Sequence, residues 1–243
     1  MHPELCKIGP FTIYSFGLFL MLAFLVAAGL VRRQAKKENI NPDFIFNLSF
    51  LTFLVAIAGA RFLYVLSNLR YYADNPIEII MLQHGGLSWF GGLIFGVAFA
   101  AIYLKKKKLP AYKVLDLVVP FLALAQAIGR IGCFLNGCCY GRASEFGVYF
   151  PVHKAILIPT QIYSSLALIV IFVVLRIIQK RPHKAGEVFF TYIVLYCTKR
   201  FFMEFLRADT AKLFFDLSLF QIFSVIIFSL SFIKLILIKK AKN

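Results

Sequence analysis

Seven apolar segments, each close to twenty residues long, constrain the fold of this chain more than any other feature of its sequence. A helix needs about 20 mostly apolar residues to cross a bilayer, and it satisfies its own backbone hydrogen bonds within the lipid. Only 16% of the 243 residues are charged, against about 25% in soluble domains. The pattern predicts an all-α polytopic membrane protein with about seven transmembrane helices, over approximately 11–31, 44–65, 86–104, 114–133, 159–178, 186–206 and 217–238.

No linker divides these segments. Neither a Gly/Ser-rich nor a Pro-rich stretch interrupts the chain, and no internal repeat is visible. We therefore expect a single transmembrane domain over residues 1–243. Met1–Pro10 lacks the basic region that opens a cleavable signal peptide. We therefore expect the first apolar segment to remain as a membrane helix.

The net charge of +16 is explained by where the cations lie. They form short runs on every second loop between the apolar segments, as cytoplasmic loops of membrane proteins do. This distribution argues against a nucleic-acid partner, and it predicts an N-terminus outside and a C-terminus in the cytoplasm. The runs comprise Arg32, Arg33, Lys36 and Lys37; Lys105–Lys108 and Lys113; Arg176, Lys180, Arg181 and Lys184; and Lys239, Lys240 and Lys242.

The same orientation predicts an extracytoplasmic active face. It places three stretches on the outer side, namely Ser67–Gly85, Gly129–Pro159 and Arg207–Asp216. The unusual polar residues of the chain lie in or near these stretches.

The most unusual stretch is Gly129–Arg142, which holds four glycines, three cysteines, two arginines and Asn136. We expect the backbone to leave the helix here, at the edge of the bilayer, and to bind a polar group. Arg130 would cost at least about 2.5 kcal/mol if it faced lipid, so it should face the protein interior or a polar cavity. Its guanidinium matches a phosphate bidentately. The alternative is a structural turn in which Arg130 caps backbone carbonyls.

The sixth segment carries a polar face. Tyr196, Arg200, Glu204 and Arg207 follow one another at intervals of four, four and three residues, so they share one side of a helix. Such residues inside a membrane helix indicate a functional site, although a structural ion-pair ladder would use the same spacing. Together with Arg130, the two arginines of this face favour binding of an anionic phospholipid headgroup.

Two further groups of residues can be explained by a structural role about as well as by a role in binding. His84–Gly92 contains the glycine pairs Gly85-Gly86 and Gly91-Gly92, which permit close helix packing or leave room for a ligand. In Thr160-Gln161-Ile-Tyr163, Gln161 and Tyr163 can form hydrogen bonds inward, or the group can simply cap a helix at the interface.

The five cysteines do not form a recognisable framework. Cys133, Cys138 and Cys139 have a spacing that is not a standard zinc or iron–sulfur pattern, so we expect no metal and no cofactor. Cys138 and Cys139 could act as nucleophiles or as a redox pair, but we favour packing of small side chains in a tight turn. Cys6 and Cys197 complete the set.

These groups, in this order, resemble the bacterial prolipoprotein diacylglyceryl transferases over nearly the whole chain. The family signature begins G-R-x-G and continues with N-G and G-R, as Gly129–Arg142 does. Other similar blocks are Ile13-Tyr-Ser-Phe-Gly17, Gly85-Gly-Leu-Ser88 with Gly91-Gly92, Pro159-Thr-Gln-x-Tyr163 and Arg200-x-x-x-Glu204-x-x-Arg207.

The resemblance implies a seven-helix fold in the bacterial inner membrane and a lipid-transfer reaction. The diacylglyceryl group of phosphatidylglycerol would move to the lipobox cysteine of a preprolipoprotein, forming a thioether and releasing glycerol 1-phosphate. Arg130 and Arg200 match the two key arginines and are the expected catalytic residues. Expected substrate-binding residues are Arg130, Asn136, Gly141, Tyr196, Glu204, Arg207, Gly85, Gly86 and Ser88.

The chain also departs from the family pattern. Phe90 stands where many members carry a histidine that is proposed to take part in catalysis, and His84, six residues earlier, is a candidate base. Cys133 and Cys138 replace an Asn and a Glu of the signature. Two rival functions remain open: a transporter or flippase that binds an anionic lipid or solute with the same arginines, and a thiol oxidoreductase.

Overall fold

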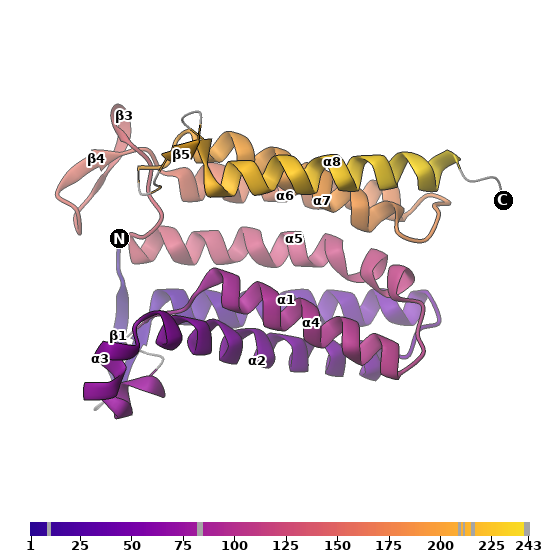
Figure 1. The fold of residues 1–243 in the computed structure, drawn as a ribbon, viewed down its shortest axis with the longest axis horizontal. Coiled ribbons are helices and arrows are strands. Elements are labelled where there is room, and N and C mark those ends of the chain that lie inside the picture. Colours follow the sequence, from indigo (N-terminus) through magenta and orange to yellow (C-terminus); the bar gives the residue numbers. More distant parts are fainter. Residues whose placement is uncertain (9–10, 82–84, 209, 211, 215–216, 241–243) are drawn as a thin grey trace. The chain divides into compact units, whose positions relative to one another are not determined.

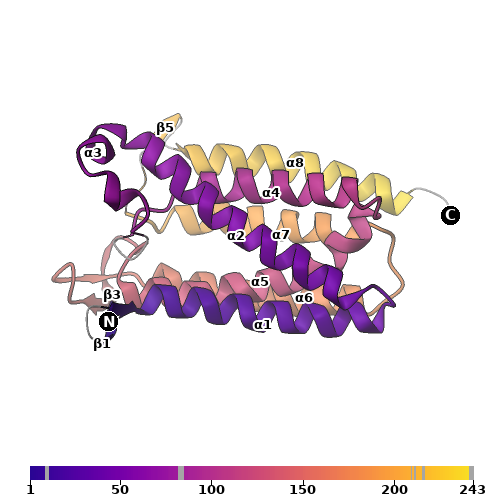
Figure 2. The same cartoon turned by 90° about the horizontal axis from the view of Figure 1, so that it is seen from below.

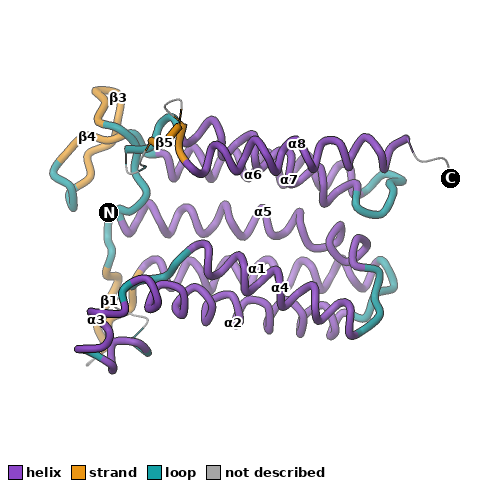
Figure 3. The backbone as a smooth tube through the Cα atoms, viewed as in Figure 1, coloured by secondary structure: helices purple, strands orange, loops and turns teal. Residues whose placement is uncertain are grey.

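The computed structural model describes residues 1–8, 11–81, 85–208, 210, 212–214 and 217–240. Helices make up most of the chain, and the strands are short (Figures 1 and 3). In order, the elements are β1 (Glu4–Ile8), β2 (Phe11–Tyr14), α1 (Ser15–Lys37), α2 (Pro42–Ser67), α3 (Leu69–Asp74), the 3₁₀ helix η1 (Pro76–Ile79), α4 (Trp89–Lys106), α5 (Ala111–Asn136), β3 (Ala143–Phe150), β4 (Ala155–Leu157), α6 (Thr160–Gln179), α7 (Glu187–Glu204), β5 (Lys212–Phe214), β6 (Leu217–Ser218) and α8 (Leu219–Lys240).

The helices confirm an all-α polytopic membrane fold. Among the described residues, six helices are long and apolar enough to cross a membrane: α1, α2, α4, α5, α6 and α8. The seventh predicted segment is occupied by α7, whose 18 residues include Glu187, Lys199, Arg200 and Glu204. The count of seven spans and the orientation of the termini therefore stay predictions.

The chain divides into two compact units. The larger unit comprises Met1–Ala27 and Tyr112–Asn243, and the smaller unit comprises Ala28–Ala111. In the larger unit, α5 to α8 run along a common direction (Figure 1), and the view turned by 90° shows α7 between α6 and α8 (Figure 2). Its core is formed by α5, α6 and α7 and contains Val119, Ala123, Ala127, Leu168, Ile171, Leu175, Val188 and Tyr192.

Successive helices of the larger unit run in opposite directions, so several of their polar ends meet at one end of the unit. Helices α5 and α7 finish where α6 and α8 begin, and the antiparallel hairpin of β3 and β4 lies at this same end (Figure 1). Residues far apart in sequence, around 136, 160, 204 and 218, therefore meet there. We call this region the signature end.

The opposite end of the larger unit is held by a buried carboxylate. Asp116 is 3% exposed, and its two oxygens accept hydrogen bonds from the backbone N–H groups of Gly186 at 2.6 Å and Phe189 at 2.7 Å. Asp116 of α5 thus caps the first turn of α7, where the helix dipole favours a negative charge.

Replacing Asp116 by alanine is expected to lower the free energy of unfolding by about 2–4 kcal/mol, because two buried N–H groups lose their acceptor at about 1–3 kcal/mol each. Denaturant unfolding of the chain in detergent micelles measures this loss. Asp43→Ala is the control: that side chain is 73% exposed in its ion pair with Arg32, so its loss should change stability by less than about 0.5 kcal/mol. Equal stability of the two variants would contradict the capping role.

In the smaller unit, glycines allow α2 and α4 to pack closely. A Cβ atom added at Gly91 would lie 2.3 Å from the carbonyl oxygen of Gly59, and one added at Gly59 would meet the side chain of Phe95 at 2.4 Å. The close helix packing expected of the glycine pairs is therefore observed at Gly91.

Candidate active site

The signature stretch is more helical than its glycines suggested. Helix α5 continues to Asn136, so Gly129 and Gly132 lie within the helix rather than in a turn. Gly132 instead allows α1 to approach, since a Cβ there would lie 2.7 Å from the Cβ of Phe19. The turn begins at Gly137, with φ of +76°, and includes Cys139, with φ of +64°. A left-handed cysteine is uncommon, and such residues concentrate at functional sites.

Side chains from the start of α6 fix the backbone of this turn. Gln161 is fully buried, and its amide nitrogen donates to the Cys138 carbonyl at 2.7 Å. The Thr160 hydroxyl donates to the Cys139 carbonyl at 2.7 Å. The prediction that Gln161 bonds inward is thus confirmed, whereas Tyr163 is 43% exposed.

Gly141 joins the signature stretch to the end of α7. Its N–H donates to the Ile158 carbonyl at 2.9 Å, and it forms an antiparallel bridge with Arg207. The next N–H, of Arg142, donates to the Leu206 carbonyl at 2.9 Å. These backbone bonds bring the two polar groups of the sequence together at the signature end.

Gly141→Ala is expected to lower the free energy of unfolding by at least about 2 kcal/mol, because the added methyl overpacks a site enclosed by backbone. Its Cβ would lie 2.7 Å from the Leu206 carbonyl oxygen and 2.8 Å from the Ile158 Cβ. Gly129→Ala is the matched control: its Cβ has nothing within 4 Å, and alanine stabilises a helix interior by about 1 kcal/mol relative to glycine. Thermal unfolding in micelles should separate the two variants, and equal melting temperatures would contradict this account of Gly141.

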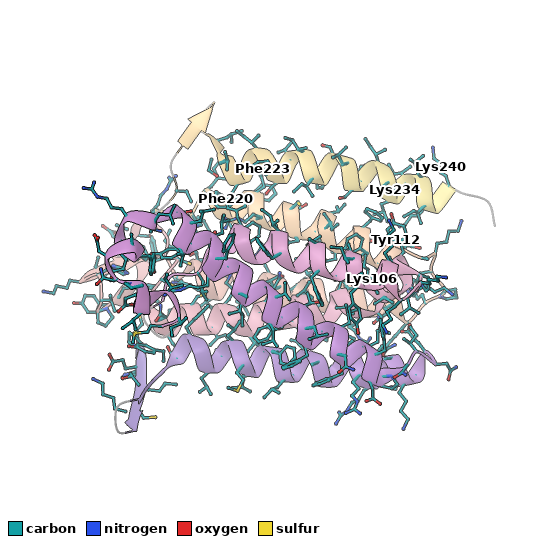
Figure 4. The ribbon with its side chains drawn as sticks, turned by 60° about the horizontal axis from the view of Figure 1, so that its bottom comes forward. Lys106, Tyr112, Phe220, Phe223, Lys234 and Lys240 are labelled. Carbon is teal, nitrogen blue, oxygen red and sulfur yellow. The ribbon has the colours of Figure 1, made fainter. Side chains whose placement is uncertain are left out.

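The predicted polar face of α7 contains a buried ion pair. Arg200 Nη2 lies 2.9 Å from Glu204 Oε2, with the two side chains 14% and 1% exposed. The other oxygen of Glu204 accepts a hydrogen bond from the Ser218 hydroxyl at 2.9 Å. The Arg200 guanidinium also lies over the ring of Phe220, 4.5 Å from its centroid. Phe220 is the second residue of α8 and is labelled in Figure 4.

Ser218 is itself fixed by a capping box. The Ser218 N–H donates to the Gln221 side-chain oxygen at 2.8 Å, and the Gln221 N–H donates to the Ser218 hydroxyl at 3.3 Å. This reciprocal pair stabilises the first turn of α8. Glu204 is thereby held by Arg200 of α7 and by Ser218 of β6, which orients the guanidinium of Arg200.

Cations of α5 and α7 interact at the signature end. The charges of Arg130, Arg200 and Arg207 all act on Lys199, and those of Arg130 and Arg207 also act on Arg200. Arg130 and Arg207 are half-buried. The three arginines of the predicted site thus act on the same lysine, and the carboxylate of Glu204 acts on Arg200.

The sequence interpretation missed Lys199. This lysine is only 9% exposed, and its Nζ lies 4.6 Å from the ring centroid of Tyr196. It lies off the face formed by Tyr196, Arg200 and Glu204, so the face pattern did not include it. The cost of a charge within a membrane helix, already applied to Arg130, would have identified it.

Three cysteines form a sulfur cluster beside these cations. The Sγ atoms of Cys133, Cys138 and Cys139 all lie within 4.8 Å of one another, and each residue is half-buried. Hydrogen bonds from Cys133 and Cys138, together with the charges of Arg207 and Arg130, lower the pKa of the Cys139 thiol. Asn136, the last residue of α5, acts on the Cys138 thiol.

The remaining predicted site residues lie in the smaller unit. The buried Arg61 organises the segment around Gly85 and Gly86: it donates to both of their carbonyls and to the carbonyl of Ile79 at 2.9 Å. Ser88 caps α4, since its hydroxyl accepts from the Gly91 N–H at 3.4 Å. Arg61 was missed by the sequence interpretation. The candidate base His84 lies outside the described residues.

Comparison with known proteins agrees with this arrangement. The family model described as prolipoprotein diacylglyceryl transferase matches residues 3–237. A phosphatidylglycerol–prolipoprotein diacylglyceryl transferase from Clostridium tetani is 37% identical over 219 residues, covering 86% of each chain. Proteins of the same name are 34% identical in Streptococcus agalactiae, covering 88% of this chain and 87% of the relative, and 29% identical in Lactiplantibacillus plantarum, covering 94% and 86%. The chain therefore belongs to the prolipoprotein diacylglyceryl transferase family.

Proposed function

We propose that this protein transfers the diacylglyceryl group of phosphatidylglycerol to the lipobox cysteine of preprolipoproteins, forming a thioether and releasing glycerol 1-phosphate. The observation that carries the proposal is the group of cations at the signature end: the charges of Arg130, Arg200 and Arg207 all act on the buried Lys199, and Arg200 is held by Glu204. A half-buried site with this charge balance suits an anionic headgroup. Membership of the family and the names of its relatives supply the reaction.

In the proposed mechanism, the arginines stabilise the charge of the phosphate. Arg130 binds the phosphate of the lipid, since it is half-buried and its charge acts on both Lys199 and Arg200. Arg200, oriented by Glu204, stabilises the glycerol phosphate as it leaves. Preorganised donors of this kind lower the barrier because they need no reorganisation as charge develops.

The other predicted residues receive positioning roles. Tyr196, Asn136 and Arg207 orient the headgroup, and Gly141 keeps the strand beside Arg207 free of a side chain. Gly85, Gly86, Ser88 and the candidate base His84 are proposed substrate contacts on the strength of the sequence resemblance.

We further propose that residues 1–243 act as one transferase domain in the bacterial inner membrane, with the active face extracytoplasmic. The charge distribution along the chain supports this orientation. The headgroup of the lipid and the cysteine of the signal peptide both lie at that membrane surface.

A transporter or flippase would bind an anionic lipid without covalent chemistry. Family membership and the transferase names of the relatives favour transfer over transport. The two functions differ in a simple measurement, because transport leaves the lipid chemically unchanged.

The test is to incubate the purified chain with phosphatidylglycerol and a peptide that carries a lipobox cysteine. Mass spectrometry should detect the peptide with a thioether-linked diacylglyceryl group, together with released glycerol 1-phosphate. A peptide with serine in place of the cysteine is the control and should stay unmodified. Absence of the lipidated product with the cysteine peptide would refute the proposed function.

A further inference from the structure

The sulfur cluster has the geometry of a three-thiolate metal site. With zinc–sulfur bonds of about 2.3 Å, the sulfurs of a tetrahedral site lie about 3.8 Å apart. The Sγ atoms of Cys133, Cys138 and Cys139 already lie within 4.8 Å of one another, so side-chain shifts of about 1 Å or less complete the arrangement. The spacing of the cysteines in sequence did not predict this site, because it matches no standard zinc pattern.

The backbone around the cluster is fixed before any metal binds. Cys139 is held in the left-handed region, with φ of +64°. The carbonyls of Cys138 and Cys139 accept hydrogen bonds from Gln161 and Thr160. A non-glycine residue in this conformation costs roughly 1–2 kcal/mol. Strain of this kind persists where the surrounding structure over-determines the backbone.

The surrounding charges suit thiolate ligands. A metal is bound by thiolate rather than by thiol, and three thiolates with one divalent cation leave a net charge of about −1. The charges of Arg130 and Arg207 both act on Cys139, so they offset this excess. The cluster and the proposed phosphate-binding arginines are therefore electrostatic neighbours.

We propose that Cys133, Cys138 and Cys139 bind one zinc ion whose fourth coordination position receives the thiol of the lipobox cysteine. Among the described residues, no histidine, carboxylate or further cysteine joins the cluster. Catalytic zinc sites characteristically have three protein ligands and one open position, whereas structural sites are closed by four. None of the three cysteines is fully buried. This inference rests on the proposed transfer function.

The chemistry of the transfer explains what such an ion would do. Coordination to zinc deprotonates a thiol outright, and the proton passes to water. The bound sulfur then attacks the glyceryl carbon that is bonded to the phosphate oxygen. A sulfur–carbon bond forms, the carbon–oxygen bond breaks, and its electron pair leaves with glycerol 1-phosphate, which takes up a proton from water. No oxidant or reductant is needed, and no histidine base is required where the chain carries Phe90.

Metal binding is tested directly on the purified, untagged chain loaded with zinc or cobalt. We expect about one zinc per chain by elemental analysis, and with Co²⁺ a near-ultraviolet sulfur-to-cobalt charge-transfer band typical of thiolate ligation. Cys133→Ser, Cys138→Ser and Cys139→Ser should each reduce the bound metal and the band to a small fraction of wild type. Cys6→Ser and Cys197→Ser are matched controls outside the cluster and should retain both.

Coordination of the substrate is tested by adding the lipobox peptide to the cobalt-loaded chain. The charge-transfer band should increase with the cysteine peptide, because a fourth sulfur joins the metal, and should not change with the serine peptide.

At pH 7 a free thiol with a pKa of about 8.5 is only about 3% ionised. Without a ligand cysteine the zinc is lost and the substrate thiol is no longer kept ionised, so kcat/KM should fall by up to about 30-fold. The kcat/KM of such a variant should rise with pH from 6 to 8, whereas that of the wild type should stay nearly constant.

Several results would overturn this inference while leaving the proposed function intact. They are lipid transfer by a chain that binds no zinc, a charge-transfer band that survives all three cluster substitutions, and a disulfide within the cluster of freshly purified protein. An unchanged band on adding the cysteine peptide would refute the substrate-binding role. Conversely, zinc bound through all three cysteines with no lipidated product would refute the proposed function and leave the metal site standing.

Discussion

Replacing Arg130 by alanine is expected to lower kcat/KM for lipid transfer by about 10²–10³-fold, the usual effect of removing one preorganised donor from a charge-stabilising site. Arg130 lies in the last turns of α5, half-buried, and its charge acts on both Lys199 and Arg200. Without it, the phosphate loses its bidentate partner. The measurement is the rate of formation of lipidated peptide at several concentrations of phosphatidylglycerol.

Two further variants make this result specific. Arg130→Lys keeps the charge but not the planar pair of donors, so its activity should fall between those of wild type and Arg130→Ala. Arg181→Ala removes an exposed arginine from the loop between α6 and α7 and should leave the rate unchanged. Near-wild-type activity of Arg130→Ala would remove this residue from the mechanism.

Replacing Glu204 by alanine is expected to lower the free energy of unfolding by about 3–5 kcal/mol, as breaking a buried ion pair typically does. Glu204 is 3% exposed, pairs with Arg200 at 2.9 Å and accepts the Ser218 hydroxyl. Its removal leaves Arg200 beside the like charges of Arg130 and Arg207. Denaturant unfolding in micelles gives the stability, and Glu145→Ala, at an exposed position, is the control.

A double variant separates the structural and catalytic parts of this pair. Replacing both partners of a buried ion pair by apolar residues is often neutral or stabilising, so Arg200→Met with Glu204→Leu should be more stable than Glu204→Ala alone. It should nevertheless fail to transfer lipid, because Arg200 is gone. Recovery of activity together with stability would show that the pair serves the fold and not the reaction.

The sequence predicted the site residues whose charge is costly to place in an apolar helix. An arginine or glutamate within an apolar segment costs energy wherever the chain folds, so Arg130, Arg200 and Glu204 could be identified from their surroundings in the sequence alone. The helical spacing of α7 likewise placed Arg200 and Glu204 on one face, and the structure shows them paired. The same cost applied to Lys199, but its place off that face concealed it.

Partners supplied by distant segments could not be predicted in this way. Ser218 holds Glu204 across 14 positions of sequence, Arg61 binds carbonyls 18 to 25 positions away, and Gly141 bridges to Arg207. Arg61 lies within an apolar segment, so its cost could be seen in the sequence, but the groups that it, Glu204 and Gly141 bind could not. Only the packing of the helices brings them within bonding distance.

By itself, the sequence determined that this protein is an all-α membrane protein and where its apolar helices lie. It also determined which charged residues need a polar environment. These features could be read from the sequence because hydropathy and the cost of burying a charge depend on a few neighbouring residues. The tertiary structure decided how far α5 extends and which groups hold Arg200 and Gly141. It also decided that the sulfurs of Cys133, Cys138 and Cys139 gather within 4.8 Å. The physical reason is that the backbone of Cys138 and Cys139 is held by hydrogen bonds from Gln161 and Thr160 of α6, and the spacing of the cysteines in the sequence does not reveal such contacts between distant segments.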